Sequence, residues 1–383
     1  MASSLRAKLA QVSGTGTAHK ADKPQMQPMT YVEHATVADE RLHDLCPDAL
    51  ARLGFEGEWP GIGRALFLDT ETTGLSRGAG TIAFMIGLGY VRDGAFIIEQ
   101  YMVGDYPDEP EMIAKLANLA KDFDVIVSFN GKAFDVPLLE SRAVMCRMQQ
   151  LFPNHRHLDL MHPSRRLWKR RIGSCRLTAL EEHILCSGRE DDLPGSEAPK
   201  RFFEYMKTGD ISLLDEVLKH NMLDIASLGT LLVALCGAYA SPDQLPELPD
   251  LYSMGRALER QGELDVARRC YEEAAKPRTA TSLKNLRDEQ FSAEACMSLS
   301  MMKKKAGDLG GAEAIWQQMA RRGQMGDAPH VELAKLYEHG RKNPRLALES
   351  AQRAMETAQT GDAIREHERR IARLRAKLQR EER

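Results

Sequence analysis

The sequence predicts an α/β protein with a mixed sheet and flanking helices, followed by an all-α helical repeat domain. Residues 65–68 (ALFL) are continuously apolar, which is typical of a strand covered on both faces. Further apolar and amphipathic segments follow, giving the order βββαβα and then a short strand with more helices. After a proline-rich stretch at 241–250, only helical periodicity remains.

Composition limits the class of protein. A chain of 383 residues can hold two or three domains, and its net charge of −3 means that any nucleic-acid-binding surface must be local. The seven cysteines are scattered without a CxxC pair, which argues against a disulfide framework or zinc ribbon and favours a cytoplasmic location. The longest apolar run, Ile225–Ala240, is shorter than the roughly 20 residues that span a bilayer, so no membrane is expected.

Residues 1–30 lack any period and are expected to form a disordered tail, with the α/β domain at 31–240. Asp93-Gly94 predicts a hairpin, so the first three strands should form an antiparallel meander, with Ser76–Gly80 as a flexible connection. Strands are expected at Arg64–Glu71, Thr81–Val91, Ala95–Val103, Val125–Phe129 and His157–Leu160, and helices at Pro47–Leu53, Glu109–Lys121, Val136–Arg147, Thr178–Leu185, Glu197–Lys207 and Ile211–Ala238.

Residues 241–250 (SPDQLPELPD) contain three prolines and are predicted to be a linker, with a helical domain at 251–383. A degenerate repeat ends on Ala267, Ala312 and Ala347, and Tyr271 and Trp316 follow the first two alanines by four residues. This pattern resembles tetratricopeptide repeats, although an ordinary helical bundle stays open. A protein partner is expected to bind through this domain.

Two carboxylates lie at the end of the first core strand. Asp69 and Glu71 are two residues apart and therefore point to the same face of a strand. Such a pair repels itself unless a cation neutralises it or one member is protonated. Because Mg²⁺ and Mn²⁺ favour carboxylate oxygens, a metal site is predicted here, and a strand running into a polar turn is the simpler alternative.

Two further segments carry candidate groups. Asp135 follows the strand at 125–129 and leads into a helix, where α/β proteins place active groups, although it could also cap that helix. His220 and Asp224 are spaced i, i+4 on one face of a helix that faces the core. A hydrogen-bonded pair within that core is the alternative for these two residues.

Three motifs follow one another along the chain: LDTETTG, NGKAFD and HNMLD. In sequence and in order they resemble the motifs of the DEDD superfamily of 3′–5′ exonucleases, which have a ribonuclease H-like fold. The chain is most similar to the YprB-like branch, through LFLDTETTGLSRGAGT, FNGKAFDVPLL, HLDLMHPSRRLWK and HNMLDI. This resemblance covers about residues 40–238 and does not include the N-terminal tail or the helical C-terminal region.

The resemblance implies hydrolysis of phosphodiester bonds with two Mg²⁺ or Mn²⁺ ions. Asp69, Glu71 and Asp224 would hold one ion, and Asp69 with Asp135 the other, with His220 as general base. His220 stands four residues before Asp224, which is the spacing of the tyrosine-containing members, whereas the histidine-containing members use five. The expected function is a metal-dependent nuclease, specifically a 3′–5′ exonuclease on single-stranded DNA or RNA.

A basic segment follows the second motif and is expected to contact the substrate. Between His155 and Arg176 there are seven lysines and arginines, with Trp168 among them, and cations beside an aromatic ring suit a single strand. A solvated charged face is the alternative. The acidic residues at 190–192 are predicted to lie in a surface loop. The residues expected to bind substrate are Thr70, Thr72, Asn130, Phe134, Arg165, Arg166, Trp168, Arg170 and Arg171.

Two other functions stay open at this point. A non-catalytic adaptor could use the sheet domain to bind nucleic acid or protein and the helical repeats to recruit a partner. A structure-selective endonuclease could be built on the same fold. The presence of all four carboxylates argues against an inactive site.

Overall fold

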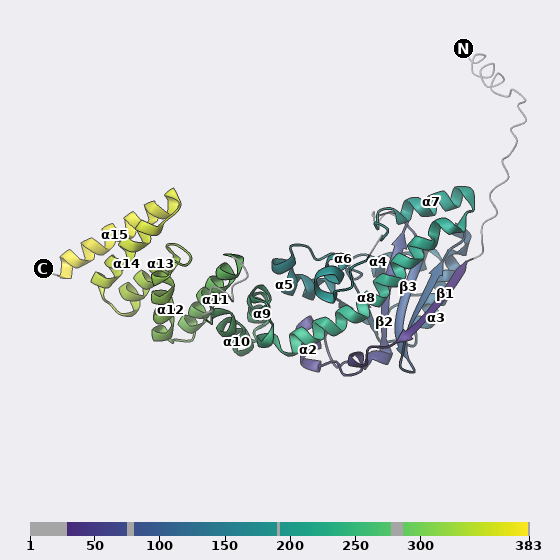
Figure 1. Ribbon diagram of the computed structural model, residues 1–383, viewed down its shortest axis with the longest axis horizontal. Helices are drawn as coiled ribbons and strands as arrows, with labels where there is room; N and C mark the ends of the chain where they lie inside the picture. The colour runs from purple at the N-terminus through teal and green to yellow at the C-terminus, as the bar shows by residue number, and fades with distance from the viewer. Residues whose placement is uncertain (1–28, 75–79, 190–191, 277–285, 382–383) are drawn as a thin grey trace, which may run out of the picture.

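The computed structural model describes residues 29–74, 80–189, 192–276 and 286–381. The molecule is elongated, with the sheet at one end and the C-terminal helices at the other (Figure 1). Residues 1–28 of the expected tail and most of the expected connection Ser76–Gly80 lie outside the described residues.

The described part of the chain contains a six-stranded mixed sheet in the order β1-β4-β3-β2-β5-β6. Strands β1, β4, β3 and β2 pair antiparallel, whereas β2, β5 and β6 pair parallel. The predicted mixed sheet with flanking helices, consistent with a ribonuclease H-like fold, is confirmed. The strands are β1 (Thr30–Val37), β2 (Ala65–Thr72), β3 (Ala83–Arg92), β4 (Ala95–Met102), β5 (Val125–Ser128) and β6 (Arg156–Asp159).

Strand β1 was not predicted. It is an edge strand that pairs with β4 from Thr30 opposite Met102 to Val37 opposite Ala95, and none of its residues is fully buried. An edge strand of this kind lacks the apolar run that marks a core strand. Thr30, expected at the end of the tail, therefore belongs to the sheet, and the tail boundary at residue 30 is corrected.

Helices cover both faces of the sheet. Phe67 of β2 packs in one core with Ile225 and Leu228 of α8, whereas Leu66 and Leu68 pack in the opposite core with α3 and α7. On the first face, Gly89 of β3 allows close approach, because a Cβ there would meet Ile225 at 2.6 Å. These helices are α2 (Pro47–Leu53), α3 (Glu109–Ala120), α4 (Asp135–Met145), α7 (Ala198–Thr208) and α8 (Asp215–Ala240).

Helix α8 crosses the sheet diagonally (Figure 1) and contacts β2, β3, β4 and α2. Among the described residues, the segment Ile211–Ala240 alone is long and apolar enough to cross a membrane by length and composition. Half of its most apolar window is buried in the fold, and a core helix passes the same test, so this is weak evidence for a membrane span. Its packing is that of a central helix beneath the sheet.

The basic segment forms a helix that was not predicted, α5 (Met161–Ile172), and α6 (Leu177–Leu180) continues into a π-turn at Glu181–Leu185. Only Pro163, Ser164, Leu167 and Trp168 of α5 are buried. The five cationic residues among its last eight positions hide this short apolar stripe from periodicity analysis.

The C-terminal region is helical, as predicted. Ala267, Ala312 and Ala347 are fully buried on α10, α12 and α14, the second helices of three successive hairpins. This placement is consistent with stacked helical hairpins, and the tetratricopeptide assignment stays a prediction. The helices are α9 (Leu248–Gln261), α10 (Leu264–Ala275), α11 (Leu286–Lys305), α12 (Leu309–Arg321), α13 (Ala328–Lys335), α14 (Pro344–Thr357) and α15 (Gly361–Glu381).

The expected linker at 241–250 is helical in part. It contains a short 3₁₀ turn, Pro242–Gln244, and the first residues of α9, with Leu248 and Asp250 buried. Pro242 and Pro249 occupy first-turn positions, where a missing N–H is tolerated, so these prolines begin helices rather than extend the chain.

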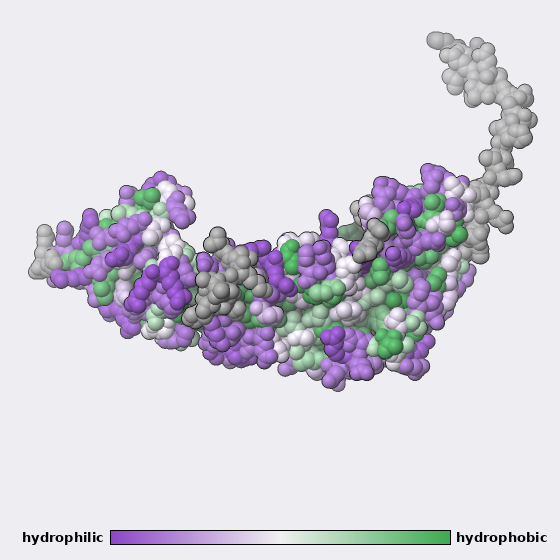
Figure 2. All heavy atoms as spheres, in the orientation of Figure 1, coloured by the Kyte–Doolittle hydropathy of each residue, from purple (hydrophilic) through white to green (hydrophobic). Residues whose placement is uncertain are grey.

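The first C-terminal helices share a core with the sheet region. Met254 and Leu258 of α9 belong to the same buried cluster as Phe67 of β2 and Trp168 of α5. On the face shown in Figure 2, hydrophobic residues gather around α2, α8 and the sheet, whereas the C-terminal helices are mostly hydrophilic. The sheet region and α9 are therefore joined by packing as well as by the chain.

Candidate active site

Strand β2 brings two of the predicted carboxylates together. Asp69 and Glu71 alternate with Thr70 along the strand, so they share the face of Phe67, which α8 covers. Glu71 is 8% exposed and Asp69 is half-buried. Helix α8 then places His220, Asn221 and Asp224 against this end of β2.

Asp135 is the first residue of α4 and reaches the site through Thr70. The hydroxyl of Thr70 donates a hydrogen bond to Oδ1 of Asp135 at 2.5 Å. Thr70, which we expected to contact substrate, therefore orients a neighbouring carboxylate in this structure.

Asp69 is oriented by a relay that was not predicted. Nδ2 of Asn221 donates to Oδ2 of Asp69 at 2.9 Å, and Nε2 of Gln100 donates to Oδ1 of Asn221 at 2.9 Å. Gly87 of β3 lies between Asp69 and Gln100 in the sheet register. A Cβ at Gly87 would lie 2.2 Å from Oδ1 of Asn221, so only glycine leaves room for this relay.

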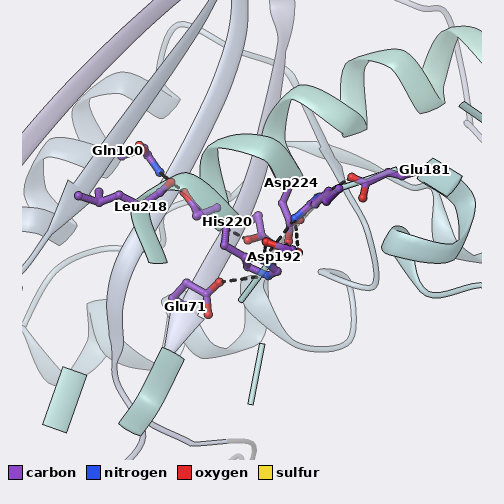
Figure 3. Close-up of polar contacts among 10 residues, drawn as sticks. Glu71, Gln100, Glu181, Asp192, Leu218, His220 and Asp224 are labelled. Carbon is purple, nitrogen blue, oxygen red and sulfur yellow. Dashed lines mark hydrogen bonds and ion pairs between the residues drawn. The ribbon is translucent and has the colours of Figure 1, made fainter. Parts of the chain in front are cut away.

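His220 lies among three carboxylates. Its Nδ1 is 2.9 Å from Oδ1 of Asp192, and its Nε2 is 3.9 Å from Oε1 of Glu71 and 3.7 Å from Oδ2 of Asp224 (Figure 3). Asp192 was expected in a surface loop; it does lie in a segment without helix or strand, but its side chain faces the site rather than solvent. Glu190 and Asp191 lie outside the described residues.

A cation is built into the site. Arg189 has a side chain that is 6% exposed and lies within ion-pair distance of Glu181, Asp192 and Asp224, with Nη1 3.1 Å from Oδ2 of Asp192 and Nη2 2.5 Å from Oε1 of Glu181. Figure 3 shows Glu181 on the side of Asp224 away from Glu71. Sequence reasoning missed Arg189 because no periodicity or motif marks it.

The clustering changes the proton affinity of these groups. Burial, with added repulsion from Asp224, raises the pKa of Asp69 well above its usual range, and burial raises the pKa of Glu71 to about 8. Burial also raises the pKa of Asp135 to about 6. For Asp224, burial raises the pKa although His220 and Arg189 oppose it. Without a cation, burial therefore draws these carboxyl groups towards their protonated form, and a bound cation would restore their negative charge.

For His220, burial affects the pKa less than the neighbouring charges do together. Burial lowers the pKa of its imidazole, but the nearby Asp224, Asp192 and Glu71 carboxylates outweigh burial and raise it. In the absence of further cations, the ring is therefore drawn towards its charged form.

The oxygen donors suit a hard divalent ion, because carboxylates are the ligands that Mg²⁺ and Mn²⁺ prefer. Among the described residues, however, no three His, Cys, Asp or Glu side chains are gathered as a finished metal-binding set. Three of the carboxylates instead have partners within the protein: Asn221 binds Asp69, Thr70 binds Asp135 and Arg189 binds Asp224. A bound metal ion would replace some of these contacts.

The structure corrects part of the predicted substrate surface. Trp168 is 4% exposed within the core, so it has no face available for a base. Arg170 pairs with Glu294 of α11 at 2.8 Å, and Arg171 pairs with Asp250 of α9 at 3.0 Å. These residues of α5 hold the sheet region to the C-terminal helices, a long-range role that sequence spacing cannot show.

The other residues that were expected to bind substrate stay predictions. Phe134, beside Asp135, is 44% exposed. The backbone N–H of Asn130 donates to Oδ1 of Asp159, and the hydroxyl of Thr72 donates to the carbonyl of Gly74. Arg165 and Arg166 line a separate pocket between α5 and α9.

Two similarities decide the family. The sequence signature of the RNase H superfamily matches residues 66–236, from β2 to α8. The uncharacterized protein YprB of Bacillus subtilis (strain 168) is 31% identical over 300 residues, which cover 76% of this chain and 69% of YprB. The chain belongs to the YprB-like branch of the RNase H superfamily.

A more distant match is the family B DNA polymerase from the hyperthermophilic archaeon Pyrobaculum calidifontis. It is 15% identical with a TM-score of 0.34, and the match covers 63% of this chain and 30% of the polymerase. Membership of the RNase H superfamily supports a nuclease, a hydrolase that acts on nucleic acid.

Proposed function

We propose that the protein is a divalent-metal-dependent nuclease, specifically a 3′–5′ exonuclease on single-stranded nucleic acid. One observation carries the proposal: three separate elements deliver Asp69, Glu71, Asp135 and Asp224 to the end of β2, with His220 among them. The preference for 3′ ends rests on the resemblance of the three motifs to the DEDD exonucleases.

Asp69, Glu71 and Asp224 would hold one Mg²⁺ or Mn²⁺ ion, and Asp69 with Asp135 a second. When bound, such ions polarise the phosphodiester and lower the pKa of water. Asn221 fixes the orientation of Asp69, and Thr70 fixes that of Asp135. The chain thereby prepares two carboxylates before any ion arrives.

His220 can accept a proton from the attacking water. Asp192 holds Nδ1, which leaves Nε2 facing Glu71 and Asp224. Arg189 places a positive charge beside Asp224, where it can stabilise negative charge that develops on a phosphate. Phe134, exposed next to Asp135, suits the stacking of a base.

One observation favours the alternative of a non-catalytic adaptor. Arg189 already pairs with Asp224, so this ligand is neutralised without a metal ion. In that case the site would bind nucleic acid or protein without cleaving a bond. The two proposals differ in whether Asp69 is needed for hydrolysis.

The experiment is digestion of end-labelled single-stranded and duplex DNA and RNA, and of a circular single strand, with Mg²⁺, Mn²⁺ or EDTA. We expect stepwise shortening of linear single strands from the 3′ end with a divalent ion and no cleavage in EDTA. Cleavage of the circle would indicate an endonuclease. Absence of hydrolysis with either ion on all these substrates, or undiminished hydrolysis by Asp69→Asn, would refute the proposed mechanism.

A further inference from the structure

A pocket of about 410 Å³ lies between α5 and α9, away from the carboxylates. We call it the α5–α9 pocket. None of the carboxylate-site residues lines it, and no acidic residue does. Its cationic lining consists of Arg165, Arg166, Lys169 and Arg170 from α5 with Arg256 and Arg260 from α9.

The spacing of these residues shows that both helices present a basic face to the pocket. The α5 residues fall at i, i+1, i+4 and i+5, and the α9 pair at i, i+4, so each set lies on one side of its helix. Helices that pack together normally face one another with apolar side chains. Two facing cationic stripes repel each other unless solvent or a bound anion screens them.

Only part of this charge is balanced within the protein. Arg170 pairs with Glu294 and lies over the rings of Tyr252 and Phe291, and Arg166 donates to the carbonyl of Leu53. The remaining cations make no ion pair with a carboxylate of the described residues; they are Arg165, Lys169, Arg256 and Arg260. The pocket therefore retains several uncompensated positive charges.

Two buried polar atoms at the pocket also need a partner. Ser253, which lines the pocket from α9, is 3% exposed, and its hydroxyl makes no hydrogen bond within the described structure. The Nε–H of Arg166 is likewise buried without an acceptor among the described residues. A buried donor without an acceptor is unfavourable, and an anionic oxygen in the pocket would satisfy the Ser253 hydroxyl.

We propose that the α5–α9 pocket binds phosphate groups. Arginine recognises phosphate through paired N–H donors, and the number of cations suits a ligand with more than one negative charge. The volume lies within the range of small-ligand sites. The phosphates can come from the backbone of a nucleic acid strand or from a small polyphosphate. This inference does not rest on the proposed nuclease activity, because neither a metal ion nor a carboxylate takes part in the binding.

The test measures binding by the full-length protein in EDTA, so that catalysis plays no part. The double variant Arg256→Ala/Arg260→Ala is compared with wild type and with Arg369→Ala/Arg375→Ala, which removes two exposed arginines from α15. One probe is a fluorescent single-stranded oligonucleotide without terminal phosphates, followed by anisotropy across salt concentrations. The other is inorganic tripolyphosphate, followed by calorimetry.

The pocket variant should bind its probe about tenfold more weakly, whereas the α15 variant should match wild type. If the ligand is a nucleic acid strand, the slope of log affinity against log salt should fall by about 1.4 for two lost phosphate contacts. If it is a small polyphosphate, the loss should appear with tripolyphosphate and not with the oligonucleotide. Thermal unfolding of the variants should show that the fold is intact, because removing like charges relieves repulsion.

Ser253→Ala provides an independent variant that keeps every charge, and it should also weaken binding of whichever probe the pocket takes. Binding of both probes unchanged in the double variant and in Ser253→Ala would overturn the inference. If the protein binds phosphate in this way but hydrolyses no nucleic acid, the proposed nuclease activity is refuted and the proposed phosphate site is retained. If the wild-type protein hydrolyses nucleic acid but the pocket variants bind both probes as wild type does, the phosphate site is refuted and the nuclease activity is retained.

Discussion

The carboxylate site and the α5–α9 pocket each gather charge of one sign, but they hold it in different ways. The carboxylate site uses short side chains fixed by a strand, by α8 and by hydrogen bonds such as that from Asn221 to Asp69. The pocket uses long side chains on two facing helices. Short, oriented acids suit a small ion with strict geometry, whereas long, adaptable cations suit a larger anion.

The two regions also differ in their internal compensation. Arg189 brings a buried positive charge among the carboxylates, whereas no acidic side chain lines the pocket. The acidic site can therefore persist without its ligand, and the basic pocket depends on solvent or a bound anion to screen its charge.

Asp69→Asn should give the largest effect, a loss of at least about 10³-fold in single-turnover hydrolysis, because both proposed ions share this ligand. Asp93→Asn is the matched control, since Asp93 is exposed in the β3–β4 turn and its backbone has a positive φ that asparagine tolerates. The control should cleave at the wild-type rate. Equal rates for both variants would remove Asp69 from the mechanism.

Arg189→Gln should lower the free energy of unfolding in EDTA by about 3 kcal/mol, because a buried cation among carboxylates is lost. Added Mg²⁺ or Mn²⁺ should then raise the melting temperature more than it does in wild type, since the ion replaces the missing charge. Thermal unfolding with and without metal measures this difference.

The control for Arg189 is Arg201→Gln, which breaks the exposed pair with Glu216 and should change stability by less than about 0.5 kcal/mol. A metal response equal to that of wild type in Arg189→Gln would mean that ions do not bind where Arg189 lies.

Asn221→Ala should slow hydrolysis by about 10–100-fold, the usual effect of removing a group that orients a metal ligand. Gly87→Ala should act in the same direction, because its Cβ would displace the Asn221 amide. Gly237→Ala, on α8, has open space around its Cβ and should leave the rate unchanged. Single-turnover rates at several metal concentrations test this, and wild-type rates in both site variants would show that the relay is only structural.

Arg171→Ala should give the smallest effect, a loss of about 1–2 kcal/mol of stability, because the carboxylate of Asp250, 3% exposed, loses its arginine partner. Phosphate binding should not change, since Arg171 does not line the pocket. Arg176→Ala, an exposed control close by, should have no effect on urea unfolding. Weaker phosphate binding in Arg171→Ala would show that the pocket and this ion pair cannot be separated.

The local sequence pattern was sufficient to predict the helices and strands whose apolar residues are regularly spaced because one or both faces are buried. The apolar run before Asp69 predicted β2, Asp93-Gly94 predicted the hairpin between β3 and β4, and Pro47–Leu53 was predicted with the bounds that the structure has. The exposed edge strand β1 and the basic helix α5 were missed, because few of their residues are buried and periodicity therefore carries little information.

The sequence by itself determined which carboxylates belong together, because Asp69, Glu71, Asp135 and Asp224 lie in short motifs with characteristic order. Only the tertiary structure decided what surrounds them. Arg189 and Gln100 reach the site from segments outside the motifs, and Gln100 holds Asn221 of the HNMLD motif in place. Arg170 and Arg171 prove to be partners of Glu294 and Asp250 rather than free cations. The physical reason is that a long charged side chain pairs through space, and its partner is set by packing, which no local spacing records.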